Sequence, residues 1–483
     1  MKMNMKRRSR PENGTGDPTL FLKRSRCVTD VEKTQIRDFT RGNITKQLLV
    51  FAWPLFLSNL LQVVYNMVDM IIVGNHLGKA GISAVSVGGD VSHFLTFVAM
   101  GFSAAGQVLI ARLIGSGQRE KLGRFVGTMS GFLMLCAALL SLLSFVFREG
   151  ILRLMNTPQE AFAGALAYSC VCMAGLVFIY GYNIVSAVLR GMGDSKHPFV
   201  FISIAAVLNL ALDVLFVMGL DMGPGGAALA TVISQGVSFV SCVVFLAVRR
   251  REFVLDMRPV DFIHWDRAML LDLVRLGLPM AIKSASIQIS KLFVNSWINS
   301  YGIAVSAFAG IANKLSSVAN LVSNAMNTAG STMVGQNIAA LEYERVKKIL
   351  VRLAMITLSV AAAFSSVIVF FPDVVFSVFT KDAAVLAIGE KYVPIAVLLF
   401  AGAAMRAIMN ALINGSGDYR MNFATAILDG IVMRIGLAVL LGLVLDMRHY
   451  GFWLGDALAG FTPFFIGLWF YFSGKWKNGA KKS

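Results

Sequence analysis

The sequence predicts an all-α polytopic membrane protein with twelve transmembrane helices, in two six-helix lobes related by a pseudo-two-fold axis along the membrane normal. Three observations predict this fold. The 483 residues are 56% hydrophobic and only 15% charged, whereas a soluble domain has about 25% charged residues. Twelve apolar runs are each long enough to cross a bilayer. A set of short motifs also recurs after about half the chain, which indicates a duplicated unit.

The twelve runs follow one another with short polar connections. In the first half they are residues 47–74, 83–111, 125–147, 161–189, 199–218 and 226–248. In the second half they are residues 276–300, 305–339, 350–371, 385–413, 421–445 and 451–473. Pro54, Pro279 and Pro394 fall in or near the start of spans, where neighbouring helices make kinks tolerable.

The positive charge sets the orientation. The formal net charge is +17, which in a soluble protein would suggest a nucleic-acid partner. Here most of the 44 Lys and Arg residues lie in the tails and in alternate loops, as the positive-inside rule requires. We therefore expect a multi-pass protein of the cell (plasma) membrane with both termini in the cytoplasm, embedded in the lipid bilayer and without a nucleic-acid partner.

Three recurring features define the repeat. The loop Arg190–Asp194 (RGMGD) recurs 224 residues later as Asn414–Asp418 (NGSGD). At nearly the same offset, Pro54 pairs with Pro279, and Ala105-Gly106 pairs with Ala329-Gly330. Because six spans per unit is an even number, both lobes run in the same sense, with a central cleft between them. The predicted organisation is a disordered basic cytoplasmic tail (1–41), an N-terminal lobe (42–248), a cytoplasmic linker (249–275), a C-terminal lobe (276–474) and a cytoplasmic tail (475–483).

Ionisable residues inside the spans are the candidates for function, because burying them in a membrane is costly. In the N-terminal lobe they are acidic, Asp69 and Asp213. In the C-terminal lobe they are mostly basic: Lys283, Lys291, Lys314, Arg406 and Arg434, with Asp429 nearby. The two lobes are therefore expected to do different jobs, and we interpret the basic group as a structural or gating network.

The acidic residues belong to polar stripes. Asn209 and Asp213 are four residues apart, so they share one helical face. Tyr65 and Asn66 precede Asp69 by about one turn. Two oxygen ligands on one face suit Na⁺, and a carboxylate alone suits H⁺, so the residues leave the choice of ion open.

These residues carry a resemblance. From about residue 42 to 475 the chain resembles the multidrug and toxic compound extrusion (MATE) family, through the Pro54 helix with Asn66-Met67-Val68-Asp69, the Arg190–Asp194 loop with Lys196, the Asn209/Asp213 pair and the Gly415–Asp418 repeat. Members of that family export organic cations in exchange for Na⁺ or H⁺. The sequence looks most like the DinF-like branch, whose cation site lies in the N-terminal lobe.

The resemblance implies roles for individual residues. Asp69, Asn209, Asp213 and Thr231 would form the cation-coupling site and hold any Na⁺, with Ala227 lending its backbone carbonyl. Substrate would contact Tyr65, Asn66, Asn183 and Ser186. In the other branch an essential Glu lies on the seventh helix, but this sequence has Ile287 there, between Lys283 and Lys291.

The predicted function is therefore a secondary active multidrug efflux antiporter that exports organic, mostly cationic amphiphilic compounds in exchange for H⁺ or Na⁺. It is predicted to be a non-enzyme without a cofactor or catalytic residues, and to function as a monomer. One alternative is a lipid-linked oligosaccharide flippase of the same superfamily, whose phosphates could meet the C-terminal basic residues. A membrane-embedded transferase would need an acidic metal motif such as DDxxD, which the sequence lacks.

Overall fold

The computed structural model describes residues 35–155 and 157–482, and within these residues it consists of helices without a strand. The N-terminal lobe contains α2 (Ile44–Gly115), η2 (Arg119–Lys121), α3 (Leu122–Val146), α4 (Arg148–Leu154), α5 (Gln159–Ala174), α6 (Leu176–Gly191), α7 (Lys196–Asp213), the π-helix η3 (Val214–Gly219) and α8 (Gly223–Val248). The short η4 (Pro259–Phe262) follows, in the segment predicted as linker.

The C-terminal lobe contains α9 (Arg267–Asn299), α10 (Ile303–Ala339), α11 (Tyr343–Phe370), α12 (Pro372–Ser377), α13 (Ala383–Ser416), α14 (Tyr419–Ile427), the π-helix η5 (Leu428–Met433), α15 (Arg434–Val439), the π-helix η6 (Leu440–Val444), α16 (Arg448–Ala459), α17 (Thr462–Phe472) and η7 (Lys475–Lys482). Because α9 begins at Arg267, it starts inside the segment predicted as linker.

These helices contain the twelve predicted spans. Among the described residues, eight helices are long and apolar enough to cross a membrane. The number is nine if α5 and α6, which are bent by 49° relative to each other, form one span. One of the eight, α2, holds two spans separated at Gly78, whose φ of 64° and ψ of −158° break the helix. The long helices α9 and α10 supply the remaining two, although their polar residues make them less apolar.

The repeat is visible in the backbone. The π-helices η3 and η6 are followed by left-handed residues 225 positions apart, Asp221 (φ 51°) and Asp446 (φ 48°), and α8 and α16 begin at positions 223 and 448. At the loop motif the offset is 224. The π-helix η5, which lies between the loop and η6, has no counterpart in α7. Since a π-helix bonds residues five apart, one added residue there accounts for the change in offset.

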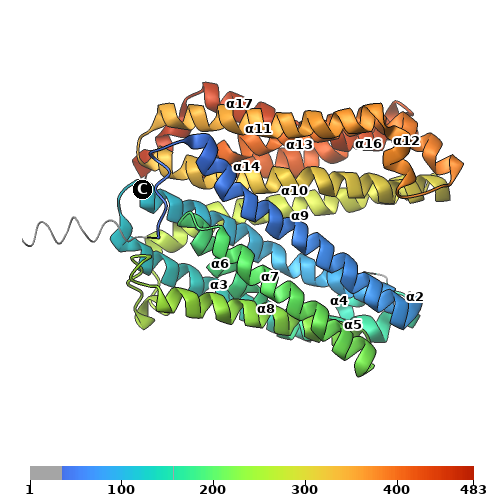
Figure 1. The fold of residues 1–483 in the computed structure, drawn as a ribbon, viewed down its shortest axis with the longest axis horizontal. Coiled ribbons are helices and arrows are strands. Elements are labelled where there is room, and N and C mark those ends of the chain that lie inside the picture. Colours follow the sequence, from blue (N-terminus) through green and yellow to red (C-terminus); the bar gives the residue numbers. More distant parts are fainter. Residues whose placement is uncertain (1–34, 156, 483) are drawn as a thin grey trace, which may run out of the picture.

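The two lobes meet along α2, α9 and α10. In Figure 1 the lobes converge near the C-terminus and diverge toward the opposite end. At the converging end, Gln107 on α2 donates from Nε2 to Thr332 Oγ1 on α10 over 2.6 Å. Helices α2 and α9 also pass very close to each other. A Cβ atom built on Gly101 of α2 would lie only 2.3 Å from the backbone nitrogen of Ala281 on α9. Small residues at a helix crossing permit this approach.

Residues 35–42, which we name the N-terminal strap, connect several parts of the molecule at the converging end. Residues 1–34 of the predicted tail lie outside the described residues, but the strap itself is packed rather than free: Phe39 is 1% exposed. Its backbone bonds to Glu252 and Met192 on one side. On the other side Phe39 N donates to Gln336 Oε1 over 2.9 Å. The strap therefore ties the N-terminal lobe and linker to α10. At the other terminus, Trp476 is likewise buried (1% exposed).

One arginine holds much of the strap. Arg345, at the start of α11, donates to the carbonyls of Phe39, Arg41 and Gly42 at 2.8 to 2.9 Å. We expect Arg345→Met to release these carbonyls to solvent, so that amide hydrogen exchange across residues 35–42 becomes at least about tenfold faster, since each bond to a charged donor contributes about 1.5–3 kcal/mol. The exposed Lys348→Met is the matched control. Unchanged exchange in Arg345→Met would contradict this role.

Candidate functional site

Two carboxylates lie together inside the N-terminal lobe. Asp69 lies on α2, nine residues before the break at Gly78, and Asp213 is the last residue of α7. The helix of Asp213 continues directly into η3, so each carboxylate lies in the half of its span nearer the end where the lobes diverge. They are near enough that the charge of Asp69 acts on Asp213. The sequence predicted both as site residues, and the structure brings them together.

Among the described residues, the buried oxygens of these two carboxylates have no hydrogen-bond partner. Asp213 is 1% exposed, and both of its carboxylate oxygens, with Oδ1 of Asp69, are buried without a hydrogen-bond partner among the described residues. An unpaired buried charge is strongly unfavourable, and it is normally neutralised or paired. The arrangement can therefore take up a proton or a monovalent metal cation, either of which neutralises one of the two negative charges.

The predicted neutral ligands adjoin one another on α7 and α8. Asn209 Nδ2 lies 3.5 Å from Thr231 Oγ1, at the long limit of a hydrogen bond. Thr231 Oγ1 donates to the carbonyl of Ala227 over 3.1 Å. Asn209 and Ala227 are buried. Amide, hydroxyl and carbonyl oxygens beside two carboxylates are the donor set that a hard alkali cation prefers, so the residues present fit Na⁺ as well as H⁺.

A small cavity opens beside these ligands, lined in part by Tyr65, Asn209, Thr231 and Gln235. The space open to a water-sized sphere is ≈ 10 Å³, about enough for one water molecule. Gln235 Oε1 is buried there without a hydrogen-bond partner in the part of the chain that the structure describes. The two carboxylates do not line the cavity. Asn209, which does line it, lies one helical turn from Asp213, so the cavity and the acidic pair are neighbouring parts of one polar region.

The four predicted substrate contacts are placed differently from one another. Tyr65 is half-buried, and the charges of both site carboxylates act on it. Asn66 is exposed. Asn183 is half-buried and donates to the carbonyl of Ile179 over 2.8 Å. Ser186 is fully buried. Only Tyr65 lines the cavity, and the assignment of the other three to substrate remains a prediction.

Two residues near the site escaped the sequence reasoning. Gln235 follows Thr231 by one helical turn, so the i, i+4 pattern that found Asn209 and Asp213 could have found it. Tyr168 on α5 is 7% exposed, and the charges of Asp69 and Asp213 act on it. No acidic or amide residue lies within one turn of Tyr168 along α5, so only the folded arrangement reveals it.

Part of the basic group of the C-terminal lobe forms ion pairs with acidic residues inside the lobe, as the sequence suggested. Arg434 bonds Asp429 at 3.3 Å and also pairs with Asp456, and it is 1% exposed. Asp429 and Arg434 are five residues apart, too far for the best pairing on an α-helix. They meet because η5 is a π-helix, in which residues five apart lie one above the other. The sequence reasoning missed Asp456, although it lies within the predicted span 451–473.

The remaining basic residues have weaker partners. Arg406 Nη2 is 3.9 Å from Asp429 Oδ1. Lys283 Nζ donates to Asn410 Oδ1 over 2.6 Å. Lys314, in contrast, is exposed.

The repeat shows how the two lobes differ at equivalent positions. At the offset of 225, Asn209 corresponds to Arg434, and Thr231 to Asp456. The weak contact between the Asn209 amide and the Thr231 hydroxyl in the N-terminal lobe is thus replaced in the C-terminal lobe by the ion pair at the equivalent positions. The equivalents of the two site carboxylates, Asp69 and Asp213, are apolar and buried, namely Val294 and Ala438. At these positions, therefore, the N-terminal lobe combines uncompensated acid with neutral oxygen ligands, and the C-terminal lobe does not.

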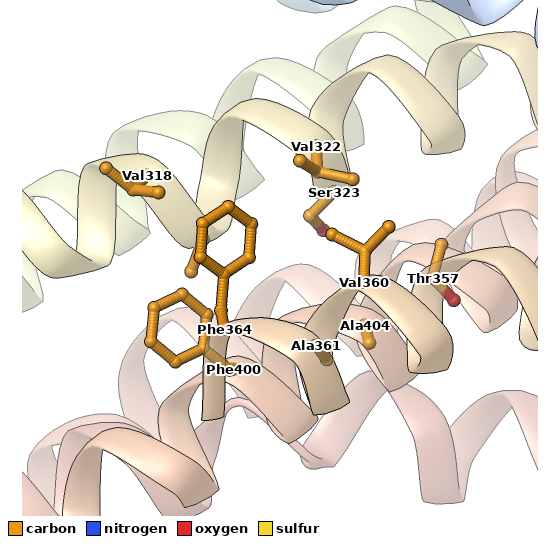
Figure 2. Close-up of a pocket in the computed structure, with 10 residues that line it drawn as sticks. Val318, Val322, Ser323, Thr357, Val360, Ala361, Phe364, Phe400 and Ala404 are labelled. Carbon is orange, nitrogen blue, oxygen red and sulfur yellow. The ribbon is translucent and has the colours of Figure 1, made fainter. Parts of the chain in front are cut away.

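A second hollow lies in the C-terminal lobe between α10, α11 and α13 (Figure 2). Phe364 and Phe400 stack beside it, with ring centroids 5.4 Å apart. Its two hydroxyls already donate to backbone carbonyls, Ser323 to Ala403 and Thr357 to Leu353. Without a charged group or a free polar atom among its lining residues, this hollow offers no chemistry comparable with the acidic site.

The duplicated architecture agrees with comparisons to known proteins. The sequence model of one family, MatE, matches residues 54–215 and again residues 279–440. The chain belongs to the MatE family. The two matched segments begin at Pro54 and Pro279, so the family unit coincides with the repeat found in the sequence. Of the site residues, Asp69, Asn209 and Asp213 fall in the first MatE segment, and Thr231 lies beyond it.

MatE relatives cover nearly the whole chain. The chain is 27% identical over 446 residues to a Bacillus subtilis protein named probable multidrug resistance protein YoeA, covering 91% of this chain and 96% of that protein. It is 24% identical over 444 residues to the probable multidrug resistance protein NorM of Thermotoga maritima, covering 90% and 94%. A solved structure described as an outward-facing multidrug resistance MATE transporter shares the fold, with a TM-score of 0.83 at 23% identity over 93% of this chain and 100% of that one.

Proposed function

We propose that this MatE protein is a secondary active efflux antiporter that exports organic, mostly cationic amphiphilic compounds in exchange for H⁺ or Na⁺. The observation that carries the proposal is the acidic pair, Asp69 and Asp213, whose buried oxygens have no hydrogen-bond partner among the described residues. The relatives named as multidrug resistance proteins support efflux of small organic molecules. Those names favour drug export over the flipping of lipid-linked oligosaccharides.

The coupling site is proposed to comprise Asp69, Asn209, Asp213 and Thr231, with the carbonyl of Ala227. A coupling ion can shift a conformational equilibrium only if it binds one state more tightly than the other. Uptake of H⁺ or Na⁺ removes the repulsion between the two carboxylates and allows α2, α7 and α8 to pack more closely. Substrate held near Tyr65, Asn66, Asn183 and Ser186 would then lose its contacts and leave toward the outside.

The proposed setting is the plasma membrane, with both termini in the cytoplasm and a monomer as the working unit. The strap and Trp476 then lie at the cytoplasmic end, where the lobes converge. The acidic site then lies in the outer part of the N-terminal lobe, at the end where the lobes diverge.

Thr231 provides a test that separates the two ions. Ethidium efflux is measured in proteoliposomes under an imposed Na⁺ gradient and, separately, a pH gradient. If Na⁺ is the coupling ion, Thr231→Val removes one neutral ligand, and we expect the Na⁺ concentration for half-maximal efflux to rise about tenfold or more. If H⁺ is the coupling ion, the variant keeps near wild-type efflux. Ethidium efflux that responds to neither gradient in the wild-type protein would overturn the proposed function.

A further inference from the structure

The basic cluster of the C-terminal lobe carries more positive charge than the protein itself neutralises. Its cations are Lys283, Lys291, Arg406 and Arg434, and its anions are Asp429 and Asp456. Arg434 alone engages both carboxylates, at the core of the lobe. The other three cations are therefore left with at most a distant share of Asp429 or Asp456. This leaves an excess of two positive charges within the spans.

The lysine side chains belong to this cluster rather than to the lipid surface. Both lie on α9, eight residues apart, which places them about 12 Å apart along the helix. Lys291 is half-buried, and it interacts electrostatically with Asp456, Arg434, Arg406 and Asp429, which come from other helices of the lobe. Its ammonium has no hydrogen-bond partner among the described residues. Arg406 likewise has a buried Nε without a partner.

An ammonium and a guanidinium inside a membrane span are costly unless an anion or water satisfies them. The N-terminal lobe shows the opposite imbalance, with two acidic groups and no basic partner bonded to them among the described residues. We propose that Lys291, with Lys283 and Arg406, binds the anionic group, a carboxylate or phosphate, of the exported compound. Guanidinium and ammonium donors are the groups that proteins use for these anions.

This inference rests on the proposed function and narrows its substrate class. The transported compound carries a negative group for the C-terminal lobe, and an amphiphile with a positive group as well would match the charge of both lobes. Asn66, the equivalent of Lys291 at the offset of 225, is neutral. The anion site is therefore a property of the C-terminal lobe alone.

A matched pair of dyes tests the inference. Rhodamine 110 has a free carboxylate, and rhodamine 123 is its methyl ester with the same cationic ring system. Binding of each dye is measured by fluorescence polarisation with the full chain in phosphatidylcholine nanodiscs, and efflux of each is measured in proteoliposomes. We expect the wild-type protein to bind rhodamine 110 about tenfold more tightly than rhodamine 123. Lys291→Gln should remove most of this preference, and Lys291→Arg should keep it.

The controls separate the possible failures. The exposed Lys314→Gln, on α10 of the same lobe, removes the same charge and should leave the preference unchanged. Efflux of rhodamine 123 that persists in Lys291→Gln keeps the proposed function intact. If wild type and Lys291→Gln treat the two dyes alike, the anion site is refuted even though efflux stands. If neither dye is transported by the wild-type protein, the proposed function itself fails.

The phosphate of an anionic lipid headgroup is a second candidate for the group that binds at this site. The binding measurements are repeated in nanodiscs that contain phosphatidylglycerol. A preference for rhodamine 110 that survives there assigns the site to the exported compound. A preference that phosphatidylglycerol removes in the wild type, while Lys291→Gln no longer responds to the lipid, confirms an anion site and assigns it to a lipid headgroup.

Discussion

Asp213→Asn is expected to reduce gradient-driven ethidium efflux at least about tenfold while leaving the protein folded. The amide has the shape of the carboxylate, but it neither takes up a proton nor offers a negative charge to Na⁺. Both carboxylate oxygens of Asp213 are buried without a hydrogen-bond partner among residues 35–155 and 157–482, so removing the charge also removes the cost of burying it. The melting temperature of the variant in detergent should therefore equal or exceed that of the wild-type protein.

Asp221→Asn is the matched control for this experiment. Asp221 lies in the same lobe, with a side chain 82% exposed, and Asn tolerates its left-handed backbone conformation. We expect wild-type efflux from this control. Full efflux in Asp213→Asn, beside an unchanged melting temperature, would refute a coupling role for the acidic pair. A large fall in melting temperature would instead show that Asp213 supports the fold.

The second large effect is a loss of stability, which we expect when Arg434 is replaced. Arg434→Gln leaves Asp429 and Asp456 without their shared partner inside the C-terminal lobe. Removing one member of a buried ion pair typically costs about 3–5 kcal/mol. We expect a clear loss of folded protein in thermal unfolding measured in detergent. The exposed Arg352→Gln on α11 is the control and should unfold like the wild-type protein.

A rescue separates lost charge balance from lost packing. Adding Asp456→Asn to Arg434→Gln removes the carboxylate whose ion pair is lost and restores the wild-type net charge of the cluster, while Asp429 keeps Arg406 nearby, and we expect part of the stability to return. An unchanged melting temperature in Arg434→Gln alone would contradict a stabilising role for the network. No recovery in the double variant would assign the loss to packing of the arginine side chain.

The sequence predicted the helices and the acidic pair because both depend on local patterns. Apolar runs mark spans, and a carboxylate in a span is conspicuous at Asp69 and Asp213. The pairing of Asp429 with Arg434 was harder, since the spacing rule assumes 3.6 residues per turn and η5 is a π-helix. The sequence also did not reveal the bend between α5 and α6 within the predicted span 161–189, because no polar residue interrupts the apolar run at the bend.

The strap was hidden for a different reason. Its polar and basic composition is typical of a solvated tail, and nothing in residues 35–42 indicates their partners. Several of those partners lie about 300 positions later in the chain, as in the bond between Phe39 and Gln336. Long-range hydrogen bonds of this kind have no local sequence pattern.

The same long separation affects how the protein is made. The side chains of Gln336, Asn337 and Arg345 are synthesised 297 to 306 residues after the strap residues to which they are hydrogen-bonded. At about 5–20 residues per second, the ribosome needs roughly 15 to 60 s to add about 300 residues. During that time the strap is outside its final position while the first lobe is already being inserted. Docking of the strap is thus a late step of biogenesis. It can be completed only after α10 and the start of α11 have reached their final positions.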